Sequence, residues 1–116
     1  MSLILLIYNI FFLFSIAGAP QFTLVPPPRV TAYEEETVTF NFNIIGNPAP
    51  KVTWYRDGIA IIASDNYADQ QKDKLVLKDL ITYDSGMYQA RAVNEMGEAE
   101  LSLELLILPL GIEYLK

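Results

Sequence analysis

The side chains that could do chemistry here are carboxylates, lysines, tyrosines and hydroxyls, because the 116 residues contain neither histidine nor cysteine. Their absence excludes a Ser-His-Asp triad, a cysteine nucleophile and nearly every zinc site. The run Glu34–Glu36 could hold a cation or a basic partner, but it is more typical of a solvated turn. The scattered Asp65, Asp69, Asp73 and Asp79 lack the compact spacing of a calcium loop. We expect no catalytic residue, no cofactor and no metal site.

Composition narrows the possible partners. Fourteen acidic against eight basic residues give a net charge of -6, and such a surface repels nucleic-acid phosphate. A hydrophobic content of 52% supplies a core, and the length suits one domain. We therefore expect protein partners and no nucleic acid.

The N-terminal segment, residues 1–19, is almost entirely apolar, and no charged side chain precedes Arg29. Its length and the small residues Ser15 and Ala17 suit a secretory signal with cleavage near Ala17, although the positive start is missing. It is shorter than the roughly 20 residues of a membrane-spanning helix, which disfavours a membrane anchor. The pyrimidine-rich end of an intron would translate into a similar run, so a gene-model artefact is a third interpretation. All three stay open, and membrane contact is expected only if residues 1–17 act as a signal or an anchor.

The region from Gln21 to Ile107 has the pattern of short β-strands. Residues 38–44 alternate apolar and polar side chains, the period of a half-buried strand, and residues 75–77 and 99–105 do much the same. Turn-forming clusters separate these runs, including Pro26–Pro28, which suits a kink where the first strand crosses between sheets. An alternative role for these prolines is as an SH3 ligand. The pattern predicts an all-β sandwich or barrel.

The most specific motif is the run Tyr83-Asp84-Ser85-Gly86-Met87-Tyr88-Gln89-Ala90. It resembles the corner before the sixth strand of an immunoglobulin sandwich. Further motifs follow at sandwich spacing: Val38-Thr39-Phe40, Gly46-Asn47-Pro48-Ala49-Pro50, Val52-Thr53-Trp54-Tyr55-Arg56-Asp57-Gly58, Leu75-Val76-Leu77-Lys78-Asp79-Leu80, Ala92-Val93-Asn94 and Gly97-Glu98-Ala99. Residues 20–107 thus resemble an intermediate-set (I-set) immunoglobulin domain of the titin, twitchin and myosin-binding-protein type.

The resemblance implies an immunoglobulin-like two-sheet antiparallel sandwich with defined structural residues. Trp54 should be the central core side chain, with Leu77 in the same core. The ring of Tyr88 should pack inward while its hydroxyl bonds a backbone group a few residues upstream. Gly86 should give the corner its backbone freedom, and the Asp84 carboxylate should cap the turn.

The two positions that the family fills with disulfide cysteines are Phe42 and Ala90 here. A large and a small side chain facing each other could fill the space of a disulfide with hydrocarbon. Losing a disulfide costs a small domain about 2–5 kcal/mol, and burying a phenylalanine returns about 2–3 kcal/mol of it. We expect folding without oxidation, which suits a reducing compartment.

Two functions are compatible with these observations. The resemblance implies a non-enzymatic structural and protein-interaction module, a fragment of a cytoplasmic titin- or twitchin-like muscle scaffold. Its partners would be neighbouring immunoglobulin or fibronectin-type domains of a longer chain, with residues 108–116 as a tail or the start of a linker. The alternative is a secreted or cell-surface adhesion or recognition domain, which the apolar N-terminus favours and the missing disulfide opposes.

Two surface features complete the predictions. Tyr55, Tyr67 and Tyr83 are candidates for exposed anchors of a partner. The scaffold interpretation predicts that the sheets resist extension through hydrogen bonds between the first and last strands, near residues 29–32 and 101–105.

Overall fold

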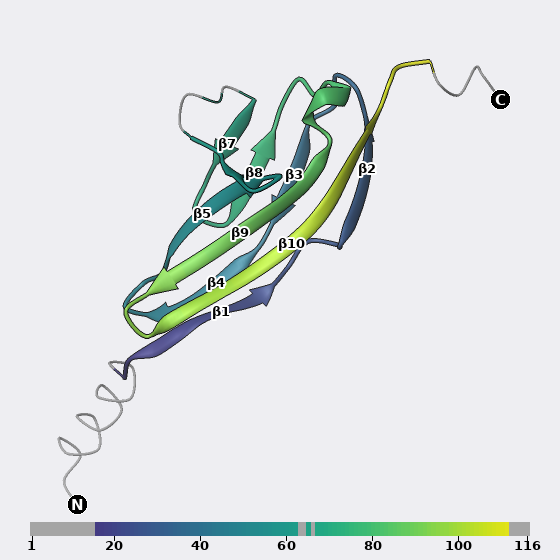
Figure 1. Cartoon of the computed structure of the whole chain (residues 1–116). Coiled ribbons are helices and arrows are strands. Elements are labelled where there is room, and N and C mark those ends of the chain that lie inside the picture. The colour runs from purple at the N-terminus through teal and green to yellow at the C-terminus, as the bar shows by residue number, and fades with distance from the viewer. Residues whose placement is uncertain (1–15, 63–64, 66, 112–116) are drawn as a thin grey trace, which may run out of the picture.

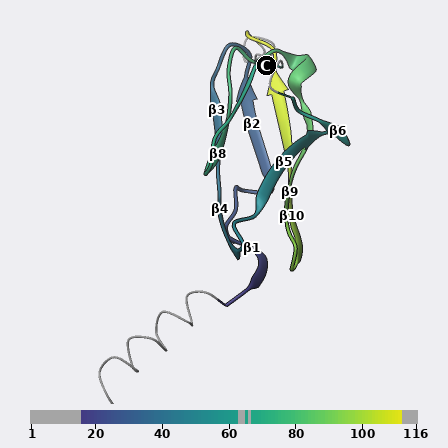
Figure 2. The same cartoon turned by 90° about the vertical axis from the view of Figure 1, so that its left-hand side faces the viewer.

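The computed structural model describes residues 16–62, 65 and 67–111 as two β-sheet layers packed face to face (Figures 1 and 2). One layer has the strand order β2-β10-β9-β5-β6, comprising Arg29–Tyr33, Gly97–Leu108, Gly86–Asn94, Lys51–Arg56 and Ile59–Ala60. The other combines β1-β4 with β3-β8-β7, comprising Gly18–Leu24, Asn43–Asn47, Val38–Asn41, Lys74–Leu77 and Ala68–Gln70. A single 3-10 turn, η1 (Thr82–Asp84), precedes β9. The predicted all-β immunoglobulin-like sandwich is confirmed. The predicted N-terminal segment lies outside the described residues up to position 15.

The first strand of the pattern divides between the layers. β1 pairs antiparallel with β4, whereas β2 pairs in parallel with β10 in the opposite layer. Pro26–Pro28 lies between them, where the missing N–H groups prevent the β1 ladder from continuing. This confirms the predicted crossing between sheets.

The predicted pairing of the first and last strands is wrong by three residues. Arg29 lies opposite Glu104 and Tyr33 opposite Leu108, so the paired segment of β10 is 104–108 and not 101–105. The parallel ladder can begin only after the prolines, and the Glu104 amide donates to the Pro28 carbonyl at 2.8 Å. Because β10 alternates evenly along its length, its pattern alone did not fix this register.

The core fills the space between the layers. The largest fully buried side chains are Trp54, Tyr88, Phe40, Leu75, Leu77, Leu80, Leu103 and Leu105. The Phe40 ring centroid lies 6.2 Å from that of Trp54 and 5.8 Å from that of Tyr88. These aromatic contacts join β3 of one layer to β5 and β9 of the other.

Candidate protein-interaction site

The two positions expected to replace a disulfide lie in the core beside Trp54. Ala90 is the cross-strand partner of Trp54, and the Phe42 and Trp54 ring centroids are 5.8 Å apart in an edge-to-face arrangement. Phe42, Trp54, Leu77, Tyr88 and Ala90 all belong to one buried cluster. Hydrocarbon therefore occupies the centre of this sandwich, and no thiol chemistry is available there.

The corner before β9 is held by Tyr88 and Asp84. The Tyr88 hydroxyl donates to the backbone carbonyl of Asp84 at 2.6 Å. The Asp84 carboxylate, on a residue only 6% exposed, accepts the Ile81 amide at 3.0 Å and an N–H of Arg56 at 3.3 Å. Burial of the Tyr88 hydroxyl raises its pKa well above its ordinary value. The polar groups of the corner thus pair with one another and with the backbone.

Gly86 allows a close contact between the corner and the β5–β6 turn. A Cβ at Gly86 would lie 2.6 Å from an Asp57 carboxylate oxygen, so no other residue fits without displacing that side chain. The Asp57 carboxylate accepts the Met87 amide at 2.8 Å. Asp57 and Gly58 both have positive φ, 49° and 82°, as a tight hairpin turn requires.

Arg56 joins the corner to the surface tyrosines, a role that the sequence analysis did not assign. Its guanidinium carbon lies 4.7 Å from the Tyr83 ring centroid and 5.7 Å from that of Tyr67, within cation–π range. Tyr83 is 76% exposed, whereas Tyr55 and Tyr67 are only half-buried and offer less free surface than expected. A pocket of about 340 Å³ lies here beside Ile59. In the sequence, the one sign of this role was an arginine two residues after the tryptophan.

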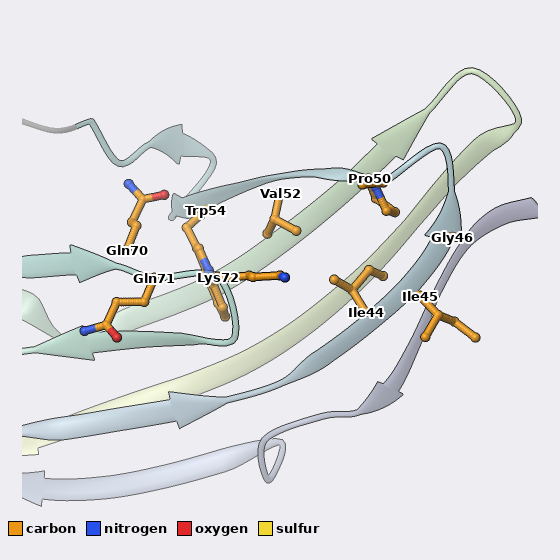
Figure 3. Close-up of a pocket in the computed structure, with 10 residues that line it drawn as sticks. Ile44, Ile45, Gly46, Pro50, Val52, Trp54, Gln70, Gln71 and Lys72 are labelled. Carbon is orange, nitrogen blue, oxygen red and sulfur yellow. The ribbon is translucent and has the colours of Figure 1, made fainter.

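A larger cleft opens on the flank of the sandwich, between β4 and β5, and Figure 3 shows the side chains that line it. Its volume is about 550 Å³. Val52 of β5 and Ile44 of β4 lie across from each other, and Lys72 extends between them from the β7–β8 turn (Figure 3). At one end β4 approaches Pro50 so closely that a Cβ on Gly46 would lie 2.7 Å from the proline ring.

The inner end of this cleft contains an unsatisfied donor. Trp54 lines the cleft and is 1% exposed, and its indole Nε1 has no hydrogen-bond partner among the described residues. Leaving a buried donor unpaired costs about 1–3 kcal/mol. The corner and the cleft therefore differ in kind, because only the cleft leaves a buried polar group unsatisfied.

The predicted acidic positions do not gather into a site. Glu34–Glu36 forms the turn between β2 and β3, with Glu35 at a φ of 72° and the Glu36 carboxylate accepting the Tyr33 amide at 3.2 Å. Within residues 16–62, 65 and 67–111, no three acids cluster as metal ligands would. In the same part of the chain, no helix has the length and apolar character for a membrane crossing.

Comparison with known proteins places this geometry in a family. Residues 20–107 match the family model of the immunoglobulin I-set domain. The chain is 31% identical to Homo sapiens neogenin over 94 residues, covering 81% of this chain and 6% of neogenin. It is 34% identical to Gallus gallus smooth-muscle myosin light chain kinase over 95 residues, covering 78% of this chain and 5% of the kinase. The chain thus spans only a small part of these relatives.

The same relationship is seen in three dimensions. The structure of titin domains Z1 and Z2 in complex with telethonin matches with a TM-score of 0.73 and 29% identity, covering 81% of this chain and 49% of that one. The residues that the family model matches, 20–107, include strands of both sheets, the corner and the tryptophan strand. This chain belongs to the immunoglobulin I-set family.

Proposed function

We propose that this domain is a non-enzymatic protein-interaction module of a muscle-type intracellular scaffold, arranged in tandem with other domains of a longer chain. The observation that carries the proposal is the hydrocarbon core at the two disulfide positions. Phe42 and Ala90 pack beside Trp54, so folding requires no oxidation. A reducing cytoplasm gives a disulfide no advantage, whereas small secreted domains usually rely on one.

The relatives support this proposal. Smooth-muscle myosin light chain kinase is similar to this chain, and titin domains Z1 and Z2 share its fold in a complex with telethonin. Interaction between proteins is therefore a function that this fold performs in a similar protein. Nothing in the described residues resembles the machinery of a kinase, so the proposed function is passive binding.

The strand arrangement gives the proposed scaffold role a mechanical basis. β2 lies near the start of the domain and β10 at its end, and five residue pairs join them in parallel. A load along the chain would shear these hydrogen bonds together instead of opening them one at a time. This proposal replaces the predicted segment 101–105 with residues 104–108.

A secreted or cell-surface recognition domain is the second candidate. Neogenin is similar to this chain at 31% identity, and the apolar run before Gly18 suits a secretory signal. In this case the hydrocarbon core would stabilise the fold in place of the disulfide, and it would not reflect a reducing compartment.

A reporter fused behind residues 1–20 separates the two candidates. The scaffold proposal expects the reporter to remain in the cytoplasm without cleavage. The control carries the same fusion with an established signal peptide in place of residues 1–20. Export with cleavage near Ala17 would overturn the intracellular scaffold and support the recognition domain.

A further inference from the structure

The cleft between β4 and β5 combines an open strand edge, an apolar lining, an unsatisfied donor and unpaired lysines. We propose that it binds an acidic peptide segment of a partner protein, which adds as a strand along the edge of β5. Alternate apolar side chains of the peptide would enter the cleft. This inference rests on the proposed function only in treating the domain as a protein-interaction module.

The main chain of β5 is unpaired beside the cleft. β5 pairs with β6 only at Tyr55 and Arg56, and one further bond runs from the Ile61 amide to the Trp54 carbonyl at 2.9 Å. That carbonyl therefore points away from β9. Because main-chain direction repeats every two residues, the N–H and C=O of Val52 point the same way. No described strand pairs with β5 there, which leaves a donor and an acceptor for an incoming strand.

The apolar lining selects what enters the cleft. Side chains of an added strand would alternate between the outer face of the sheet and the interior. Those on the interior face would meet Val52, Ile44 and Pro50, all half-buried. Peptide residues with small or branched apolar side chains suit this lining, and every second residue of the peptide is free to be polar.

The indole of Trp54 supplies a directional contact. Its Nε1 is the buried side-chain donor for which no partner occurs among the described residues. A carbonyl or hydroxyl oxygen of the peptide that reached the inner end of the cleft would satisfy it. Binding would thus recover part of a cost that the free domain already bears.

Charge selects an acidic peptide. Lys72 extends over the cleft (Figure 3). The alternation of β5 places Lys51, the residue before Val52, on the outer face of the sheet. Both lysines are exposed, and in the described part of the chain the ion pairs are formed by Arg56 and Arg91 instead. The lining of the cleft includes no carboxylate. The lining itself thus carries one positive and no negative side chain, although Asp69 accepts from Gln71 at its rim, and on a chain of net charge -6 this favours acidic residues in a partner.

The edge of β2, at the other end of the same sheet, is less suitable. β2 pairs only with β10, so its second side is also open. The pocket at its end is lined by Glu34 and Glu36, which would repel an acidic peptide. The combination of edge, apolar lining and positive charge therefore favours β5.

The test is a titration of the 15N-labelled full chain with an acetylated, amidated peptide of four Glu-Val repeats. Trp54 is the single tryptophan of the chain, so its indole N–H gives one unambiguous signal. We expect that signal and the Val52 amide signal to shift. A matched peptide of four Lys-Val repeats should bind at least about fivefold more weakly. N-methylation of the valines or of the glutamates tests strand pairing, because only alternate N–H groups face β5. One methylated peptide should lose binding and the other keep it.

Lysine variants test the charge argument without altering the core. Lys51→Glu with Lys72→Glu should weaken binding of the Glu-Val peptide about fivefold or more, while Lys78→Glu, an exposed lysine outside the cleft, should not. Three results would overturn the proposal. Both methylated peptides could bind equally, the shifts could lie along β2, or the Trp54 and Val52 signals could stay unchanged at millimolar peptide. Val52 shifts that depend on protein concentration alone would assign the edge to a second copy of this chain. None of these results depends on the export assay.

Discussion

The corner and the cleft lie along the same strand, β5, and are constructed in opposite ways. At the corner, Arg56, Asp84 and Tyr88 pair with one another and with backbone groups, and the Tyr83 ring packs over the arginine. At the cleft, no described strand pairs with the edge of β5 at Val52, and the buried indole N–H of Trp54 has no partner within the part of the chain that the structure describes. A single strand, β5, thus carries Arg56 in the self-paired corner and Val52 at the open cleft.

The difference indicates where stability and binding are located. Groups that satisfy each other stabilise the fold and gain little from a partner. Unsatisfied groups contribute nothing to folding, or oppose it, and gain when a ligand completes them. Substitutions at the corner should therefore change the free energy of unfolding, whereas substitutions at the cleft should change binding.

The largest effect is expected where the two regions share the core. Phe42→Ala should lower the free energy of unfolding by about 3–5 kcal/mol, because it leaves a cavity beside Trp54 and the small Ala90. The control is Ile45→Ala, at a half-exposed residue of β4 three positions after Phe42, and it should lower the free energy of unfolding far less. Urea unfolding followed by tryptophan fluorescence measures both. A loss under about 1 kcal/mol for Phe42→Ala would show that the ring does not replace a disulfide.

The next effect concerns the corner. Tyr88→Phe removes the hydroxyl that donates to the buried Asp84 carbonyl, and should cost about 1–3 kcal/mol. Tyr55→Phe, at a half-buried tyrosine on β5, is the matched control and should cost less. Equal losses in chemical denaturation would contradict a special role of the corner hydroxyl.

The same hydroxyl predicts a dependence on alkaline pH. Because burial raises the pKa of Tyr88 in the folded state, the folded chain keeps a proton that the unfolded chain releases. This contribution is complete below the unfolded pKa of about 10 and is lost as pH rises above it. The stability difference between the native chain and Tyr88→Phe should therefore begin to shrink near about pH 10 and continue to shrink as the pH rises further. A difference that stays constant would place the ionisation elsewhere.

A smaller effect is expected at the exposed side of the corner. Tyr83→Ala removes a ring that is 76% exposed but lies over Arg56. Exposed cation–π pairs contribute about 0.5–1 kcal/mol, so the loss should be of that order. Ile59→Ala, an exposed neighbour without such a contact, should leave the thermal midpoint almost unchanged.

The smallest effect should occur at the cleft itself. Lys72→Ala should change the free energy of unfolding by less than about 0.5 kcal/mol, since the side chain is exposed and forms no ion pair among the described residues. The same variant should weaken binding of the Glu-Val peptide. A large loss of stability here would remove the contrast between the two regions.

The sequence predicted the corner better than the cleft, for a physical reason. Asp84, Gly86 and Tyr88 act through short-range geometry, and each residue type limits what its neighbours can do. The alternation of residues 38–44 likewise identified the buried face of β3 and β4. Such constraints are local and therefore visible in one sequence.

The cleft depends on what is missing between distant strands. It exists because β6 and β7 are too short to cover the flank, so the edge of β5 remains open beside Val52. Strand lengths of two and three residues leave no clear pattern. The register of β10 was missed for a related reason, since Leu101 to Leu105 alternates as regularly as residues 104–108. Pairing between strands far apart in the sequence determines both the open edge of β5 and the register of β10.

The crossing at Pro26–Pro28 gives the molecule a direction. By placing β1 on one sheet and β2 on the other, it links the two layers on one flank of the sandwich, while the cleft opens beside β5, toward the other end of the same strand order. If such domains follow one another in a chain, the rotation between neighbours would decide whether successive clefts face a common partner or point around the axis in different directions.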